Sequence, residues 1–466
     1  MSNEIRSYDG GNTANPRQLV HPTTVSEIQD VLKDSARFPG PVRAMGSYHS
    51  LTPCVSTDGT VIDMKSMTRV IEINPGNLTF TAEAGLQFID ASHALRAQNL
   101  QFHTNIEIGN MTLGSAATCH TKDALDGIEF GQVSSYISRI KYVTPTGELA
   151  EASDEKDPEL MAKVRSSYGL CGVVYEVTFK VMPMQIAHFS YHPRPLKDLT
   201  EEEVNGIIDS SQGLTCWTVG DTSVFQRRDA TEQPAGLLGP LLARARRRLW
   251  NHDGAALGHF IDTFAPEGDL RNLLHNQWVA GLNLLYATLA HGGGFSLPNP
   301  DKTVDYRKTP DSARYAFTFW AFPTKQWLKT MREYADFAED YFKKTGFRCN
   351  MPLGSYHIRK DQHSLLSYTY DGDIFSIDPI HAATDHEAWN NFLKAFNDFA
   401  YQRGGIPLFN QSPFVERKHV EAAYGDRWKQ FSDWVRAVDP QGRMLNPFFA
   451  ELLSAADQGQ GKATIE

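Results

Sequence analysis

The chain has 466 residues, 41% of them hydrophobic and 21% charged, so it is long enough for two or three domains with ample buried core. Its formal net charge of −10 argues against nucleic acid as a routine partner, because no net basic field attracts phosphates. The five cysteines are scattered without Cys-x-x-Cys spacing, so we expect neither a metal site nor a disulfide framework. With no apolar run of about 18 residues and no signal peptide, we expect a cytoplasmic protein without a membrane span.

The first predicted elements lead to a loop at residues 43–50. A strand at Val20 precedes a helix that Thr24 is suited to cap, and its apolar residues recur at helical spacing (Val25, Ile28, Val31, Leu32). A second strand then runs into the loop Arg-Ala-Met-Gly-Ser-Tyr-His-Ser. Its glycine and serines let the backbone turn and expose N–H groups, with Arg43 nearby to offset negative charge. The loop therefore suits a phosphate or pyrophosphate, and an ordinary Gly- and Ser-rich loop is the alternative.

The next elements include a second candidate ligand segment at residues 108–120. Alternating apolar residues predict strands at 61–64, 70–74 and 79–85, and a helix follows at 88–100. Residues 114–118 read Gly-Ser-Ala-Ala-Thr, and such small residues let the backbone approach a flat or phosphorylated ligand. A tightly packed turn of small residues is the alternative reading of this segment.

Later segments indicate a further strand and helix pattern. Strands are predicted at 137–143, 169–179 and 316–323, and a helix at 327–341. Residues 355–359, Ser-Tyr-His-Ile-Arg, alternate in a way that places His357 and Arg359 on one face of a strand. A histidine there is suited to act as a general base, and an arginine to stabilise negative charge. Simple solvation of a strand edge by both residues is the alternative.

Three of these motifs together resemble a known superfamily. Arg-Ala-Met-Gly-Ser-Tyr-His-Ser, Val-Ile-Asp-Met and Thr-Ala-Glu-Ala-Gly are similar to the N-terminal domain of vanillyl-alcohol oxidase (PCMH-type) FAD flavoproteins, particularly their aldonolactone and alditol oxidase branch. The likeness extends from about residue 15 to 183 and returns at 438–447. It implies an α+β fold: a two-subdomain PCMH-type FAD-binding domain (13–183), an α+β cap or substrate domain with an antiparallel sheet (184–404), and a C-terminal segment that returns to the FAD domain (405–455).

The resemblance implies FAD as cofactor and identifies candidate contacts. Relatives commonly attach the flavin 8α-methyl group to the histidine of the first loop, here His49, and usually carry a small or polar residue before it, where this chain has Tyr48. Covalent and noncovalent FAD therefore both stay open, and a second link through Cys119 is a minor alternative. The implied FAD contacts are Arg43, Ala44, Met45, Gly46, Ser47, Tyr48, His49, Ser50, Met111, Gly114, Ser115, Thr118, Val173, Val174 and Asn446.

The same comparison identifies candidate catalytic residues. Relatives carry Glu-x-Arg where this chain has His357 and Arg359, so the arginine matches and a histidine replaces the acid. Relatives also carry Arg-Pro-His-Trp-Gly-Lys near residues 404–411, where this chain lacks both the histidine and the lysine. Asn410 and Gln411 remain as hydrogen-bonding side chains for flavin or substrate. We expect His357 to act as the base, with Arg359, Asn410 and Gln411 as the other catalytic residues.

The resemblance implies an FAD-dependent oxidoreductase that removes a hydride from a C–H bond of a small-molecule substrate. An oxidase that uses dioxygen is favoured over a dehydrogenase that uses another electron acceptor. Because the family's lysine and glutamate are absent and the cap segment is rich in aromatic residues, we expect a substrate that is not strongly sugar-like. Two alternatives stay open: an oxidative cyclase, desaturase or dehydrogenase of secondary metabolism, and an FAD-binding protein without turnover.

Overall fold

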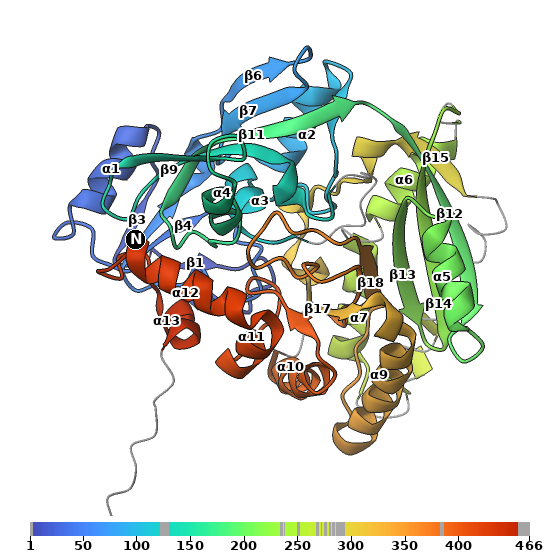
Figure 1. The fold of residues 1–466 in the computed structure, drawn as a ribbon. Helices are drawn as coiled ribbons and strands as arrows, with labels where there is room; N and C mark the ends of the chain where they lie inside the picture. Colours follow the sequence, from blue (N-terminus) through green and yellow to red (C-terminus); the bar gives the residue numbers. More distant parts are fainter. Residues whose placement is uncertain are drawn as a thin grey trace, which may run out of the picture.

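The computed structural model describes residues 3–454, except 122–129, 234–235, 237, 249–251, 267–269, 383–385 and parts of 272–293. It confirms the expected α+β architecture. Figure 1 shows the N-terminal part, in blue to teal, together with the C-terminal helices in red, whereas the green-to-orange middle of the chain forms the other side of the molecule. No helix within the described residues is both long and apolar enough to cross a membrane.

The first sheet positions the loop at 43–50. Its three strands are parallel and ordered β3 (Gln18–Val20), β5 (Thr60–Asp63) and β4 (Val42–Met45). Helix α1 (Val25–Lys33) begins at the predicted cap, because the Thr24 side chain accepts a hydrogen bond from the Glu27 N–H and Glu27 reciprocates. The apolar face of α1 packs against β4 and β5 in one core cluster. The loop therefore starts at the carboxyl end of a buried parallel strand. A short antiparallel pair, β1 (Ile5–Arg6) and β2 (Thr13–Ala14), precedes this sheet.

The second sheet is antiparallel. Its order is β10 (Leu149–Ser153), β9 (Ile137–Val143), β11 (Val173–Pro183), β7 (Thr79–Glu83) and β6 (Val70–Asn74), and β8 (Leu100–Phe102) also pairs with β11. The helices of this region are α2 (Phe88–Arg96), α3 (Leu113–Thr118) and α4 (Pro158–Arg165). Helix α2 is shorter than the predicted 88–100, because Asn99 has a positive φ of 56° just before β8 begins.

The third sheet, which we call the cap sheet, has eight antiparallel strands. Their order is β15 (Phe295–Pro298), β12 (Ile186–Pro195), β14 (Thr222–Thr231), β13 (Gly213–Val219), β18 (Leu353–Ile358), β19 (Ile374–Ile377), β17 (Trp320–Pro323) and β21 (Ile406–Pro407). The strand predicted at 316–323 is divided, because β16 (Tyr315–Phe317) pairs with β20 (Ile380–Ala382) in a separate two-stranded sheet.

The two faces of the cap sheet have different neighbours. One face, which includes Cys216, Phe225 and Phe375, shares a core cluster with residues of α5 (Glu201–Asp209), α9 (Thr324–Thr345) and α10 (His386–Tyr401). The opposite face includes Trp217 and Tyr356 and belongs to another cluster. This second face is turned toward the first two sheets, since Trp217 and Tyr356 share a cavity with residues 106–108. We call it the inner face.

The remaining helices are α6 (Leu238–Arg248), α7 (Gly254–Phe264), α11 (Arg417–Tyr424), α12 (Asp426–Val438) and α13 (Pro447–Leu453). Strand β11 ends at Pro183 in the second sheet, and β12 begins at Ile186 in the cap sheet. We keep 13–183, 184–404 and 405–455 as proposed domain boundaries.

Candidate cofactor and substrate site

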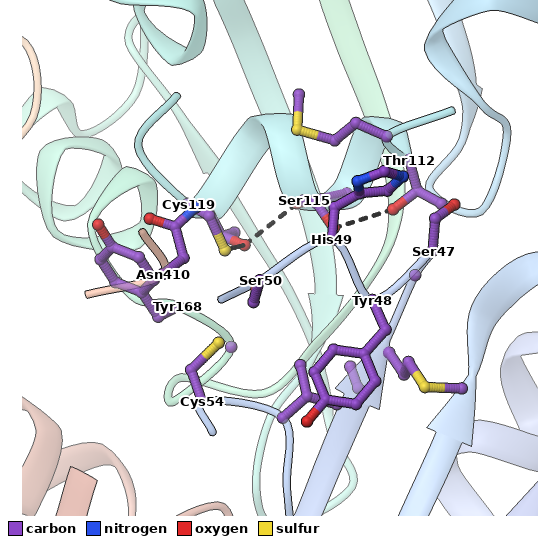
Figure 2. Close-up of a pocket in the computed structure, with 18 of the residues that line it drawn as sticks. Ser47, Tyr48, His49, Ser50, Cys54, Thr112, Ser115, Cys119, Tyr168 and Asn410 are labelled. Carbon is purple, nitrogen blue, oxygen red and sulfur yellow. Dashed lines mark hydrogen bonds between the residues drawn. The ribbon is translucent and has the colours of Figure 1, made fainter. Parts of the chain in front are cut away.

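A cavity of about 1000 Å³, which includes space open to solvent, lies where the 43–50 loop meets α3 and residues 410–411. Figure 2 shows His49, Ser50 and Ser115 around this cavity, with Asn410 and Tyr168 at one end of it. All of the residues predicted to contact FAD line it except Val173 and Asn446, and the predicted catalytic residues Asn410 and Gln411 also line it. The tertiary structure therefore brings both predicted ligand segments to one cavity.

Gly46 allows the loop to approach α3 closely. A Cβ atom at Gly46 would lie 2.2 Å from Thr112 Oγ1 and 3.1 Å from Ser115 Oγ. The Ser47 hydroxyl donates a hydrogen bond to the Asn110 carbonyl and accepts one of 3.1 Å from Gln87 Nε2. These contacts hold the loop against the second ligand segment, so the two segments form one wall.

Arg43 has a different role from the one predicted. Its side chain is fully buried, and it donates hydrogen bonds to the carbonyls of Cys54, at 3.0 Å, and of Met444, at 2.9 Å, and to the Tyr168 carbonyl. The sequence predicted that this guanidinium offsets the charge of a bound phosphate. In the structure it joins three distant segments of the chain, although it also forms part of the cavity wall.

Tyr48 does not block His49. Its backbone has a φ of 49°, in the left-handed region that favours glycine, which accounts for the small residue of relatives at this position. Its ring is 5% exposed and packs in a cluster with Ile5 and Val61, and its hydroxyl lies 2.7 Å from Ser56 Oγ. In Figure 2 the ring points away from His49. The bulk of Tyr48 is thus no obstacle to a covalent bond at His49.

We expect Tyr48→Phe to lower the free energy of unfolding by about 1 kcal/mol and to leave FAD binding unchanged. The substitution keeps the packed ring and removes only the hydrogen bond to Ser56. Urea denaturation and the flavin-to-protein ratio measure the two quantities. Ser56→Ala is the matched variant: it should cost a similar amount, and the double variant should cost less than the sum. Loss of FAD from Tyr48→Phe would contradict this placement of the ring.

His49 is half-buried, and its imidazole is neutral at pH 7. Its ring stacks on Tyr8, with 4.4 Å between ring centroids, and meets the edge of Tyr306 at 6.0 Å. Burial lowers the pKa of His49 to about 4, although a hydrogen bond with Asn110 opposes the shift. Within the described part of the chain, His49 Nε2 has no hydrogen-bond partner. A neutral imidazole with an unpaired nitrogen beside the cavity fits a flavin attachment point.

The second ligand segment forms a compact wall of small side chains. The Gly114 N–H donates to the Ala84 carbonyl at 2.8 Å, and Thr118 Oγ1 donates to the Gly114 carbonyl at 3.1 Å. The helix is therefore tightly packed, and its residues Gly114, Ser115 and Thr118 also line the cavity. Cys119 also lines the cavity, but burial raises the pKa of its thiol to about 12. A protonated thiol does not favour the second flavin link that was considered for Cys119.

Two predicted FAD contacts lie away from the cavity wall. Val173 and Val174 are consecutive in β11, so they point to opposite faces: Val174 lines the cavity and Val173 is buried against α1. Asn446 donates to the carbonyls of Pro53 and Ser56, at 3.0 and 2.9 Å, and to that of Cys54. Its side-chain oxygen caps α13 by accepting from the Phe449 N–H. Asn446 therefore holds residues 53–56 in place.

The predicted base, His357, and Arg359 are not placed to act at the cavity. His357 lies on the face of β18 opposite to Tyr356, and Arg359 directly follows the strand. His357 Nε2 is 3.5 Å from Asp373 Oδ2, and its ring contacts Phe375. Arg359 approaches the carbonyls of residues 211 and 212 at 3.4 Å. Neither residue is among the described residues that line this cavity or the one beside it.

A second cavity, of about 700 Å³ including open space, adjoins the first. The two share four wall residues, Ile108, Met111, Phe317 and Gln411. Its other polar groups are Glu107, Thr121, Trp217, Tyr306, Tyr315 and Tyr356. The sequence analysis assigned a role to none of these six. They come from separate loops, from strand β16 and from the inner face of the cap sheet, and no short motif connects them.

The polar atoms at the junction of the two cavities are suited to bind a ligand. Asn410 Nδ2 donates a hydrogen bond to the His120 carbonyl at 3.1 Å, so the side-chain oxygen of Asn410 is the atom left to contact a ligand. Among the described residues, neither this oxygen nor that of Gln411 has a hydrogen-bond partner. Buried acceptors without partners are costly, so N–H or O–H donors of a ligand fit here.

Comparison with known proteins supports the same assignment. Residues 16–153 match the FAD binding domain family, and residues 177–452 match the D-arabinono-1,4-lactone oxidase family. The L-gulonolactone oxidase of Scyliorhinus torazame is 21% identical over 96% of this chain and 98% of that protein. The L-gulono-1,4-lactone dehydrogenase of Mycobacterium tuberculosis is 30% identical, over 45% of this chain and 48% of that protein.

Solved structures agree on the fold. Cholesterol oxidase from B. sterolicum superposes with a TM-score of 0.76 at 12% identity, covering 97% of both chains. Chitooligosaccharide oxidase gives a TM-score of 0.66 at 13% identity, over 96% of this chain and 94% of that one. The two family matches show an FAD-dependent oxidoreductase of the vanillyl-alcohol oxidase (PCMH-type) superfamily, which confirms the resemblance. Within it, the chain belongs to the D-arabinono-1,4-lactone oxidase family.

Proposed function

We propose that this protein oxidises an aldonolactone, that FAD occupies the first cavity, and that the substrate binds in the second. The observation that carries the proposal is the second cavity, which holds one carboxylate and three phenol groups and shares Gln411 and three other residues with the first cavity. Its carboxylate and phenol groups suit a ligand with several hydroxyl groups. The names of the relatives, which are sugar-lactone oxidases and dehydrogenases, support the same substrate class. The expectation of a substrate that is not strongly sugar-like is therefore replaced.

FAD, when bound, supplies the two-electron acceptor for the substrate's C–H bond. The residues that would surround the cofactor belong to the 46–50 loop, to α3 and to the segment before and at the start of β11, where Tyr168, Gly169, Gly172 and Val174 line the cavity. Gln411 belongs to both cavities, so its unpaired oxygen is available to a donor group of either ligand. We propose that Asn410 and Gln411 contact the flavin or the substrate, and that His357 and Arg359 do not.

We further propose that FAD is covalently attached to His49, because the ring is neutral and its Nε2 is unpaired within the described residues. Acid precipitation of the purified protein is expected to leave the flavin in the pellet. His49→Ala should move it to the supernatant, whereas Cys119→Ala, the control from the same cavity wall, should not. Flavin released from the wild-type protein would contradict attachment at His49.

Turnover tests the proposed substrate. D-Arabinono-1,4-lactone and L-gulono-1,4-lactone are expected to bleach the flavin absorbance under anaerobic conditions, and alditols of equal length to bleach it more slowly. We propose an oxidase, so admission of air should restore the absorbance and produce hydrogen peroxide. A flavin that lactones reduce but air does not reoxidise would identify a dehydrogenase. A flavin that no lactone reduces would refute the proposed substrate class.

A further inference from the structure

One carboxylate of the second cavity, Glu107, belongs to no motif found in the sequence. It lies in the loop between β8 and α3, where its carbonyl accepts a 2.8 Å hydrogen bond from the Val304 N–H. The next residue, Ile108, is held by an isolated β-bridge to Val304. The backbone of Glu107 is thus fixed by the segment at Val304, and its side chain is 17% exposed.

A buried arginine orients the Glu107 carboxylate. Arg228 Nη2, on the inner face of β14, lies 2.7 Å from Glu107 Oε1, and the Arg228 side chain is fully buried. The guanidinium is held in turn by Gln226, whose Oε1 accepts from Arg228 Nε at 3.1 Å and from Nη2 at 3.0 Å. The planar fork of the arginine therefore fixes the direction of the ion pair.

The second carboxylate oxygen lies among phenol groups of the cavity. Tyr356 Oη is 3.4 Å from Glu107 Oε2, and the hydroxyls of Tyr306 and Tyr315 lie 2.8 Å apart. Burial raises the pKa of Tyr306 and of Tyr315, with Glu107 contributing in both cases, so these phenols stay protonated. A carboxylate only accepts hydrogen bonds, whereas phenols both donate and accept. This set matches a ligand that carries several hydroxyl groups.

We propose that Glu107 is the specificity-determining residue for substrate hydroxyl groups and that Arg228 is its positioning residue. Glu107 Oε2 accepts a hydrogen bond from one hydroxyl of a polyhydroxylated lactone, and Tyr356 contacts the same region of the ligand. The inference rests on the proposed function. It also accounts for the residue that β18 presents to the cavity. The acid of the second cavity comes from the 103–112 loop, so β18 contributes Tyr356 there rather than an acid.

The expected effect follows from the strength of charge-assisted hydrogen bonds. Glu107→Gln keeps the shape and removes the charge, so kcat/KM for L-gulono-1,4-lactone should fall by about 10- to 100-fold. The loss should appear in the lactone dissociation constant, measured from the concentration dependence of anaerobic flavin reduction. Flavin content should be unchanged. Glu176→Gln is the matched control, because Glu176 is 15% exposed and pairs with Lys141 at 2.8 Å on the second sheet, and it should leave the kinetics unchanged.

Monodeoxy lactones make the test specific. For the analogue that lacks the hydroxyl bound by Glu107, wild type and Glu107→Gln should have the same kcat/KM within about two-fold. An equal penalty for every analogue, or a loss confined to kcat, would overturn the assignment. Because Glu107→Gln leaves the Arg228 charge without this carboxylate, Glu107→Gln/Arg228→Met is the second variant: it should restore stability while retaining the kinetic loss.

The two proposals fail in different ways. If wild-type protein is reduced by no lactone, the proposed substrate class is wrong and the role of Glu107 falls with it. If wild-type protein oxidises lactones and Glu107→Gln matches it for all of them, only the assignment of Glu107 is wrong.

Discussion

Arg43→Met is expected to lower the free energy of unfolding by about 3–5 kcal/mol, because it leaves three buried carbonyls without their charged donor. Those carbonyls belong to Cys54, Tyr168 and Met444, so one side chain holds together the loop after β4, the turn before β11 and the C-terminal segment. Methionine fills much of the same volume, which limits the cavity contribution. Chemical and thermal denaturation measure the loss.

Two variants make the Arg43 result specific. Arg43→Lys keeps the charge but cannot reach all three carbonyls in the same planar arrangement, so we expect an intermediate loss. Arg17→Met is the surface control, since the Arg17 side chain is 69% exposed and its ion pair with Asp58 spans 3.7 Å; it should change stability by less than about 0.5 kcal/mol. If the Arg43→Met variant keeps wild-type stability but no longer binds FAD, that result would support the phosphate-binding role predicted from the sequence.

Gly46→Ala is expected to weaken FAD binding by about 10-fold or more, since overpacking costs about 1–3 kcal/mol. Its Cβ would lie 2.2 Å from Thr112 Oγ1 and 2.9 Å from Thr112 Cγ2, so the loop and α3 must separate. Both segments line the FAD cavity, and their separation changes its width. Titration with FAD is best done in the His49→Ala background, where we expect noncovalent binding.

The clash at Gly46 can be relieved from the other side. Thr112→Ala removes both threonine atoms that a Cβ at Gly46 would meet, so Gly46→Ala/Thr112→Ala should recover most of the FAD affinity. Gly206→Ala is the control, because no atom lies within 4 Å of a Cβ at that position. It should leave FAD binding unchanged. A double variant as weak as Gly46→Ala alone would show that the close approach of loop and helix is not what limits binding.

Residues that are close in sequence account for the two predicted ligand segments that the structure brings to one cavity. The loop at 43–50 and the segment at 108–120 each carry their contacts within a few residues, so a short motif is enough to find them. The capped helix α1 follows from local spacing in the same way. The resemblance of these motifs to those of known flavoproteins also identified the superfamily and the α+β fold class.

The face of β18 illustrates where sequence reasoning ends. Alternation assigns His357 and Arg359 to one side of the strand, but it does not say which side meets the cavity. All six residues of β18 are buried, because helices cover one face of the cap sheet and the FAD-side sheets cover the other. A strand buried on both faces has no polar and apolar alternation to distinguish them.

By itself, the sequence determined the fold class, the cofactor and the two segments that line the proposed FAD cavity, because each follows from motifs whose residues are neighbours along the chain and resemble those of known flavoproteins. Only the tertiary structure decided the partners of Arg43, the direction of the Tyr48 ring and the substrate-facing set of Glu107, Arg228 and Tyr356. Along the sequence, Arg228 is 121 residues from Glu107, and Tyr356 is 249 residues from it. Packing of one sheet against another brings them together, and no local pattern records that packing.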